Sequence, residues 1–311
     1  MIDANIDMTV NIAGVTLKNP VIAASGTFAF GREYARFFDL SRLGGICVKG
    51  LTMSPRKGNA GVRLWETPGG LLNSIGLENP GIPAFIANEL PSLKKSGVVI
   101  IANLSGSDME EYVKGAELLN KSDVDMIELN ISCPNVKAGG MAFGLEPEIA
   151  GNLTSRVRGA AKDKPLIVKL SPNAPSVSAV ALSCVKEGTD ALSLVNTFKA
   201  MAIDTVNRKP VFDNITAGLS GPAIKPIALR MVWELYDALI DAKARAPIIG
   251  VGGIENVSGA LEFLMAGAAA IQVGSATFVN PLAMVEIIDA LRDYMTVNNI
   301  SKIDDISIRR R

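Results

Sequence analysis

The chain has 311 residues, 48% of them hydrophobic, with 31 basic and 31 acidic residues. This balance leaves no net charge to attract nucleic acid or an anionic membrane, and the basic triplet Arg309 to Arg311 is typical of a solvated tail. No apolar run reaches the roughly 18 residues of a membrane span and no signal peptide is recognisable, so we expect a cytoplasmic protein.

Along the chain, short apolar runs alternate with longer segments whose apolar residues recur at helical spacing. A hairpin of two short strands is predicted first, at residues 9–12 and 15–17. Eight strands buried on both faces are then predicted at residues 21–24, 46–49, 98–104, 126–131, 166–170, 191–196, 248–251 and 270–273. Helices are predicted at residues 81–95, 108–121, 146–162, 176–187, 225–243, 257–266 and 281–295, with a weaker one near 33–39.

This alternation predicts an α/β fold, a single (β/α)8 TIM barrel over residues 1–311, because no linker or change of composition divides the chain. Asp108 is placed to cap a helix, and Gly188 and Gly267 stand where helices should end. Long loops follow the second strand (residues 50–80), the fourth, and the sixth (residues 197–222). Because loops after barrel strands form the active-site face, we expect ligand contacts there.

Histidine is absent, which excludes His general bases, Ser–His and Cys–His nucleophilic sites and His-ligated metals. The three cysteines, Cys47, Cys133 and Cys184, lack the spacing of zinc or iron–sulfur sites. We therefore expect no metal in this chain, and a reducing compartment.

Polar residues end successive predicted strands: Lys49, Asn103, Asn130, Lys169, Asn196 and Thr197. Each one alone would most often cap a turn or reach solvent. Together, at the same end of the barrel, they favour a pocket for a flat, anionic ligand rich in hydrogen-bonding groups.

Glycines end the last two strands, at Gly252-Gly253 and at Gly274-Ser275. Either pair alone could serve a turn, but loops after the seventh and eighth strands of a barrel commonly hold a phosphate. The pattern does not distinguish a cofactor phosphate from a substrate phosphate.

Cys133 follows the fourth strand, just ahead of a glycine-rich stretch that ends at Gly144. With no histidine available, its thiol is the natural candidate for proton transfer, since cationic neighbours lower a thiol pKa from about 8.5 toward neutrality. Cys47 and Cys184 fall within a strand and a helix, where a small buried apolar residue is favoured.

Four segments, residues 73–81, 130–144, 196–204 and 218–226, together resemble the class 1 dihydroorotate dehydrogenases, and more closely class 1B, the NAD-linked branch. The resemblance covers nearly the whole chain. It implies FMN as the phosphate-bearing cofactor, contacted by Ser25, Lys49, Gly50, Asn103, Asn130, Lys169, Val195, Gly221, Gly252, Gly253, Gly274 and Ser275. It implies dihydroorotate as substrate, held by Lys49, Asn73, Ser74, Ile75, Gly76, Leu77, Asn130, Asn196 and Thr197.

The resemblance also implies the chemistry and the partner. Cys133, with Lys49 and Asn130 beside it, would remove the C5 proton while the C6 hydride passes to the flavin, and Lys169 would offset developing negative charge. Class 1B enzymes pair with a subunit that carries FAD and a [2Fe-2S] cluster and reduces NAD. Such a partner is therefore expected, in a heterotetramer built on a homodimer of this chain.

Three other functions stay open. A related FMN barrel, similar to dihydropyrimidine dehydrogenase, would act on another pyrimidine. A non-redox phosphate-binding isomerase or lyase would use Lys49 or Lys169 as its catalytic amine and would be colourless. A non-catalytic subunit that binds a phosphorylated ligand is also compatible with the fold. The four ordered motifs favour dihydroorotate oxidation in pyrimidine biosynthesis.

Overall fold

The computed structural model describes residues 6–132 and 143–309, so Cys133 lies outside the described residues. Parallel strands close into a barrel of eight, as predicted, and each predicted strand is present with ends shifted by at most two residues. In chain order they are β3 (Val21–Ala23), β4 (Gly45–Cys47), β7 (Val99–Leu104), β8 (Met126–Asn130), β9 (Leu166–Lys169), β10 (Ala191–Leu194), β15 (Ile248–Val251) and β16 (Ala270–Val273). The (β/α)8 fold is therefore confirmed.

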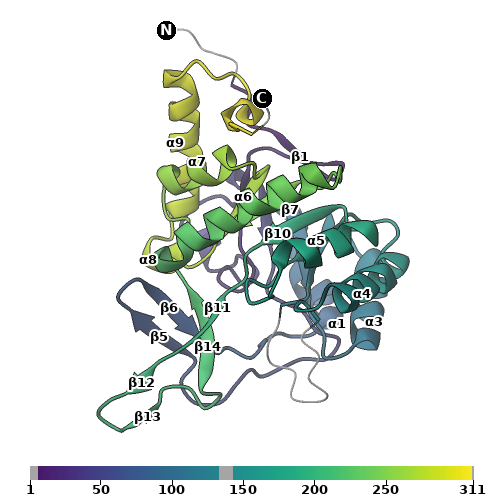
Figure 1. Cartoon of the computed structure of the whole chain (residues 1–311), viewed down its shortest axis with the longest axis vertical. Coiled ribbons are helices and arrows are strands. Elements are labelled where there is room, and N and C mark those ends of the chain that lie inside the picture. The colour runs from purple at the N-terminus through teal and green to yellow at the C-terminus, as the bar shows by residue number, and fades with distance from the viewer. Residues whose placement is uncertain (1–5, 133–142, 310–311) are drawn as a thin grey trace.

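Helices pack around this barrel and cover its outer face (Figure 1). They are α3 (Met109–Asn120), α4 (Pro147–Ala160), α5 (Val177–Lys186), α6 (Lys225–Asp241), α7 (Val257–Met265), α8 (Ala276–Val279) and α9 (Ala283–Val297). The Asp108 cap is confirmed, because its carboxylate accepts a hydrogen bond from the Glu111 N–H at 2.8 Å. Gly188 and Gly267 end their helices with φ of +96° and +108°, a conformation that glycine adopts without strain.

Two predicted helices differ from expectation. Residues 81–95 form α1 (Ile82–Ala84), a π-helical turn η3 (Phe85–Glu89) and α2 (Leu90–Lys95) instead of one α-helix. Pro91 has no N–H to donate to the carbonyl one turn earlier, which interrupts the regular hydrogen-bond ladder. The weak helix near residues 33–39 is reduced to two 3-10 turns, η1 (Tyr34–Arg36) and η2 (Leu40–Arg42).

The two long connections, predicted as loops, build a second sheet. It has the order β11-β14-β6-β5, from β5 (Leu64–Thr67), β6 (Gly70–Asn73), β11 (Phe198–Met201) and β14 (Thr216–Ser220). Antiparallel pairing of Asn73 with Gly218 and of Leu71 with Ser220 joins the two connections across this sheet. A short hairpin, β12 (Ile203–Asp204) with β13 (Lys209–Pro210), extends from it at the foot of Figure 1.

The opposite end of the molecule holds both described ends of the chain. The predicted N-terminal hairpin is confirmed as β1 (Val10–Ile12) and β2 (Val15–Leu17), which pair antiparallel. Asp7 forms a bridge with Lys302, next to the 3-10 turn η5 (Ile303–Ile306). The chain ends are therefore tied together, away from the second sheet (Figure 1).

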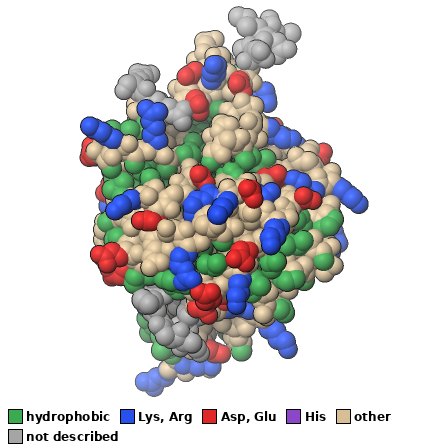
Figure 2. All heavy atoms as spheres, turned by 90° about the vertical axis from the view of Figure 1, so that its right-hand side faces the viewer, with side chains coloured by type: hydrophobic (Ala, Val, Ile, Leu, Met, Phe, Trp, Pro, Cys, Tyr) green, Lys and Arg blue, Asp and Glu red, His purple; other side chains and the backbone are tan. Residues whose placement is uncertain are grey.

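Basic and acidic side chains are interspersed over the face that Figure 2 displays, which agrees with the balanced composition. Within the described part of the chain, no helix is long and apolar enough to cross a membrane.

Candidate active site

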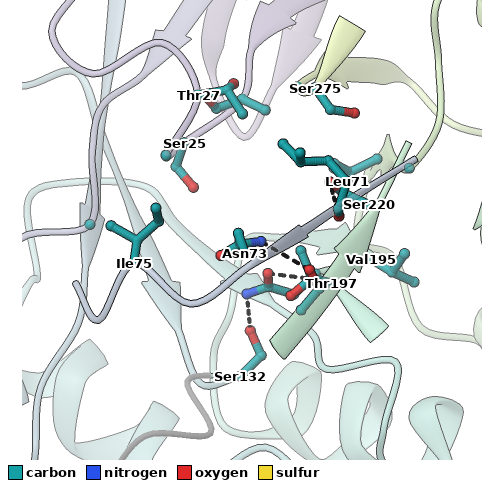
Figure 3. A pocket seen from close by; sticks show the side chains of 18 of the residues that line it. Ser25, Thr27, Leu71, Asn73, Ile75, Ser132, Val195, Thr197, Ser220 and Ser275 are labelled. Atoms are coloured by element: carbon teal, nitrogen blue, oxygen red, sulfur yellow. Dashed lines mark hydrogen bonds between the residues drawn. The ribbon is translucent and has the colours of Figure 1, made fainter. Parts of the chain in front are cut away.

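A cavity of about 340 Å³ lies between the carboxyl-terminal ends of the barrel strands and the second sheet. This volume falls within the range of small-molecule sites. Every predicted ligand-binding residue that the structure describes lines it: Ser25, Lys49, Gly50, Asn73, Ser74, Ile75, Gly76, Leu77, Asn103, Asn130, Lys169, Val195, Asn196, Thr197, Gly221, Gly252, Gly253, Gly274 and Ser275. Ser25, Asn73 and Ser132 face the same space in Figure 3, although they come from distant parts of the sequence.

Amide side chains form a connected group on one wall of the cavity. Asn130, at the end of β8, donates from its amide nitrogen to Asn103 Oδ1 at 3.4 Å and to Ser105 Oγ at 3.3 Å. Its Oδ1 accepts from Ser132 Oγ at 2.8 Å and from Asn196 Nδ2 at 3.3 Å. Asn196 also donates to Ser132 Oγ. These bonds fix which end of each amide is presented to a ligand.

Ser132 was not predicted as a site residue. It stands between Asn130 and Cys133, and its hydroxyl bonds to both Asn130 and Asn196. Its position within the 130–144 segment was the only indication in the sequence, and a serine beside a turn usually has just a local role. The side chain of Cys133 lies outside the described residues, but Ser132 brings the chain to the cavity immediately before it.

Lys169, which lines the cavity, pairs with a buried glutamate behind it that the sequence did not predict. Glu128 on β8 is completely buried, and the Lys169 ammonium lies 3.7 Å from its Oε1. Burial raises the pKa of Glu128, but the Lys169 ammonium and hydrogen bonds from Gln272, Cys47 and Ser193 outweigh it and lower that pKa below its ordinary value. Glu128 is therefore ionised at neutral pH. The signal for it was a glutamate within an otherwise apolar strand, where burial needs compensation.

The two described cysteines remain thiols at neutral pH. Burial is the main cause that holds the pKa of Cys47 well above its ordinary value, and the negative charge of Glu128 is the second. Burial raises the pKa of Cys184 to about 11. Cys184 is thus the inert buried residue that was expected. Cys47 is buried too, but it is more than a small apolar side chain, since its Sγ donates to Glu128 Oε1 at 3.1 Å.

Glycines that follow β15 and β16 also line the cavity. Gly252 and Gly253 have φ of +136° and +67°, so other residues would be strained there. A Cβ atom at Gly253 would lie 2.7 Å from the Gly221 carbonyl oxygen and 2.8 Å from Lys225 Cβ. Gly274 and Ser275 follow β16 at the same cavity. Because three of these four lining residues have no side chain, their backbone can approach a ligand closely, as phosphate binding requires.

Connections after β4 and β10 complete the cavity. Lys49 is half-buried, and its backbone N–H donates to the Ala29 carbonyl at 3.0 Å. Asn73 Nδ2 donates to the Gly218 carbonyl at 3.2 Å, so one connection orients a residue of the other. In Figure 3, Asn73, at the end of β6, lies close to Thr197.

Metal coordination is not supported by the geometry. Among residues 6–132 and 143–309, no three His, Cys, Asp or Glu side chains are grouped in a way that could hold a metal ion. The cavity instead combines amides, three lysines (Lys49, Lys169 and Lys199) and glycine backbone.

The fold and cavity together define a (β/α)8-barrel protein with a polar, glycine-bordered site at the strand ends, the usual position of barrel active sites. The family model described as dihydroorotate dehydrogenase matches residues 7–295. The chain belongs to the dihydroorotate dehydrogenase family.

Curated relatives match over nearly their full length. The dihydroorotate dehydrogenase B (NAD(+)) catalytic subunit of Petrotoga mobilis is 58% identical, covering 97% of this chain and 98% of that one. Proteins of the same name from Thermoanaerobacter pseudethanolicus and Caldicellulosiruptor saccharolyticus are 50% and 51% identical, over 96% of this chain and 97% and 98% of their own. Among solved structures, a DHODH from Eimeria tenella in complex with ferulenol has a TM-score of 0.79 at 20% identity, covering 100% of this chain and 91% of that one. That likeness supports the fold.

Proposed function

We propose that this chain is the catalytic subunit of an NAD-linked dihydroorotate dehydrogenase, which oxidises dihydroorotate to orotate with FMN in pyrimidine biosynthesis. The observation that carries the proposal is a single cavity that joins a glycine-bordered wall to a group of amide and lysine side chains. Family membership and relatives about half identical over their whole length support the same activity.

The residues present fit FMN. Gly252, Gly253, Gly274 and Ser275 line the cavity and would hold the phosphate through their backbone N–H groups. The flavin ring would be contacted by Ser25, Lys49, Gly50, Asn103, Asn130, Lys169, Val195 and Gly221, which line the rest of the cavity. FMN, when bound, supplies the hydride acceptor that no side chain can provide.

The substrate would lie between the flavin contacts and the second sheet. Lys49 offers an ammonium for its carboxylate, and Asn73, Asn130 and Asn196 offer amides for its carbonyl and N–H groups. The residues of the β6 connection, Ser74 to Leu77, and Thr197 would enclose it. Since the site lacks histidine, the Cys133 thiolate would take the C5 proton, with Lys49 and Asn130 orienting the substrate.

Electrons would leave through a second subunit. This chain has no dinucleotide-binding GxGxxG after a strand and no cysteine cluster, so FAD and a [2Fe-2S] cluster would belong to a partner that reduces NAD. The word "subunit" in the relatives' names supports such a partner. We infer a cytoplasmic heterotetramer built on a homodimer of this chain, and expect the isolated chain to reduce artificial acceptors but not NAD.

An anaerobic absorbance spectrum of the purified protein, before and after dihydroorotate is added, tests the proposal. A flavin band that bleaches is the expected result. A flavin band that dihydroorotate does not bleach would assign the site to another pyrimidine if dihydrouracil bleaches it, or if uracil restores the band after the flavin has been reduced chemically. A protein that stays colourless after incubation with FMN would refute the redox function and favour an isomerase or lyase.

A further inference from the structure

Glu128 accepts hydrogen bonds from four side chains, two at each carboxylate oxygen. Its Oε1 accepts from Asn103 Nδ2 at 2.7 Å and from Cys47 Sγ at 3.1 Å. Its Oε2 accepts from Gln272 Nε2 at 2.7 Å and from Ser193 Oγ at 2.9 Å. Glu128 does not itself line the cavity, whereas its partners Asn103 and Lys169 do. Any effect of Glu128 on a ligand must therefore pass through other residues.

The carboxylate determines the orientation of two carboxamides. Because the amide nitrogen of Asn103 faces Glu128, its Oδ1 faces the cavity side and accepts from Asn130 Nδ2 at 3.4 Å. Because the amide nitrogen of Gln272 faces Glu128, its Oε1 faces the Lys169 ammonium at 3.4 Å. Reversal of either amide would place a donor against a donor.

The Lys169 ammonium is held but not saturated by these contacts. It lies 3.4 Å from Ser25 Oγ, 3.4 Å from Gln272 Oε1 and 3.7 Å from Glu128 Oε1. These distances exceed the roughly 2.7–2.9 Å of a charge-assisted hydrogen bond, so the ammonium can still form a short bond to a ligand. Its side chain is 5% exposed and lines the cavity, so its direction of approach is restricted.

We propose that Glu128 is a positioning residue of the flavin site: its buried carboxylate aims the Lys169 ammonium and the Asn103 amide into the cavity and balances the charge of that lysine. This inference rests on the proposed use of FMN. Substitution Glu128→Gln keeps the shape but turns one acceptor oxygen into a donor. The new NH2 group then faces the NH2 group of Asn103 or of Gln272. If Asn103 turns away, its contact to Asn130 is disturbed, and if Gln272 turns away, its contact to Lys169 is disturbed.

The experiment compares holoenzymes of wild type, Glu128→Gln, Lys169→Met and the double variant. Asp190→Asn is the matched control, because Asp190 also binds a basic residue, Arg158 at 2.6 Å, and the Leu166 backbone N–H, but does not line the cavity. FMN dissociation is followed by the fluorescence released on dilution, and the flavin midpoint potential by dye-coupled reductive titration. Thermal unfolding reports stability separately.

Glu128→Gln is expected to weaken FMN binding at least roughly tenfold, the scale of a lost hydrogen bond to a charged group. Removing the negative charge should also raise the midpoint potential, shifting the reduced-to-oxidised ratio roughly tenfold, or ~30 mV for a two-electron couple. Both effects should shrink in the Lys169→Met background. Asp190→Asn should lower thermal stability alone.

The positioning role would be overturned if the Glu128→Gln and Asp190→Asn variants had the same FMN affinity and the same flavin potential. It would also be overturned if Glu128→Gln had effects of the same size in the wild-type and Lys169→Met backgrounds. If Glu128→Gln does not fold, Ser193→Ala decides, because Ser193 touches Oε2 and does not line the cavity. Ser193→Ala keeps the Glu128 charge but removes one of the hydrogen bonds that fix the carboxylate, so it should weaken FMN binding, and an unchanged affinity would overturn the inference. A wild-type protein that binds no FMN would instead refute the proposed function itself.

Discussion

Gly253→Ala tests the phosphate wall, and the structure supplies both the magnitude and a control. At φ of +67° an alanine incurs roughly 1–2 kcal/mol of backbone strain. Its Cβ would also lie 2.7 Å from the Gly221 carbonyl oxygen and 3.0 Å from the Lys225 backbone nitrogen, neither of which can rotate away. Overpacking of this kind costs about 1–3 kcal/mol, so the total is about 2–5 kcal/mol. Separation of the Gly221 and Gly253 segments should weaken FMN binding at least roughly tenfold.

Gly97→Ala is the matched control. Gly97 has nearly the same φ, +70°, yet nothing lies within 4 Å of its added Cβ, and it stands before β7 at the other end of the barrel. It should cost the backbone term alone and leave FMN affinity unchanged. Thermal unfolding and FMN titration of both variants are the assays. Equal losses of stability, or unchanged FMN affinity in Gly253→Ala, would refute the argument that close backbone approach at Gly253 forms the phosphate site.

Three further outcomes are expected. Asn196→Ala should raise the KM for dihydroorotate by roughly two- to tenfold while FMN stays bound, since a lost hydrogen bond between neutral groups costs about 0.5–1.5 kcal/mol. Steady-state kinetics with an artificial acceptor would show this, and an unchanged KM would remove Asn196 from the substrate site. Cys133→Ala should bind FMN and orotate but lose most flavin reduction at neutral pH, whereas Cys47→Ala should retain it; wild-type-like stopped-flow reduction in the first variant would exclude Cys133 as the base. Burial raises the pKa of Cys184 to about 11, so the folded protein holds a proton that the unfolded chain releases near pH 9. This contribution to stability is therefore present below pH 9 and is lost as pH rises toward 11. Melting temperatures over that range should fall less steeply in Cys184→Ala than in the wild type, and parallel curves would contradict the argument.

The barrel could be predicted from sequence because its strands are continuous apolar runs separated by helical spacing and punctuated by residues such as Asp108 and Gly188. The ring of cavity residues followed from their order, since strand ends of a parallel barrel meet at one face. Which role each residue has does not follow from that placement. Lys49 and Lys169 both line the cavity, and only ligand-bound chemistry separates their functions.

The second sheet could not be predicted for a physical reason. β6 and β14 are about 145 residues apart, as are Asn73 and Gly218 where they pair, and each is short and half-buried. A short strand shows no periodicity that distinguishes it from a loop, and its partner is set by tertiary contacts that local propensity does not contain. Its effect on the site is direct, because the pairing brings Asn73 and Thr197 to the same side of the cavity.

The charge pair in the barrel interior is difficult to explain as a source of stability. Burying two charges costs several kcal/mol for each ion, and an apolar pair of similar volume is often neutral or more stable by about 1–4 kcal/mol. Glu128 is nevertheless fully buried with four hydrogen-bond donors, all from other barrel strands. Three of these donors, Cys47, Ser193 and Gln272, lie outside the cavity lining. Such a network restricts its side chains to one arrangement, whereas apolar side chains packed around Lys169 would not fix the position of its ammonium. The interior polarity of this barrel is therefore better explained by the cavity that Lys169 and Asn103 line than by the folding of the strands that carry them.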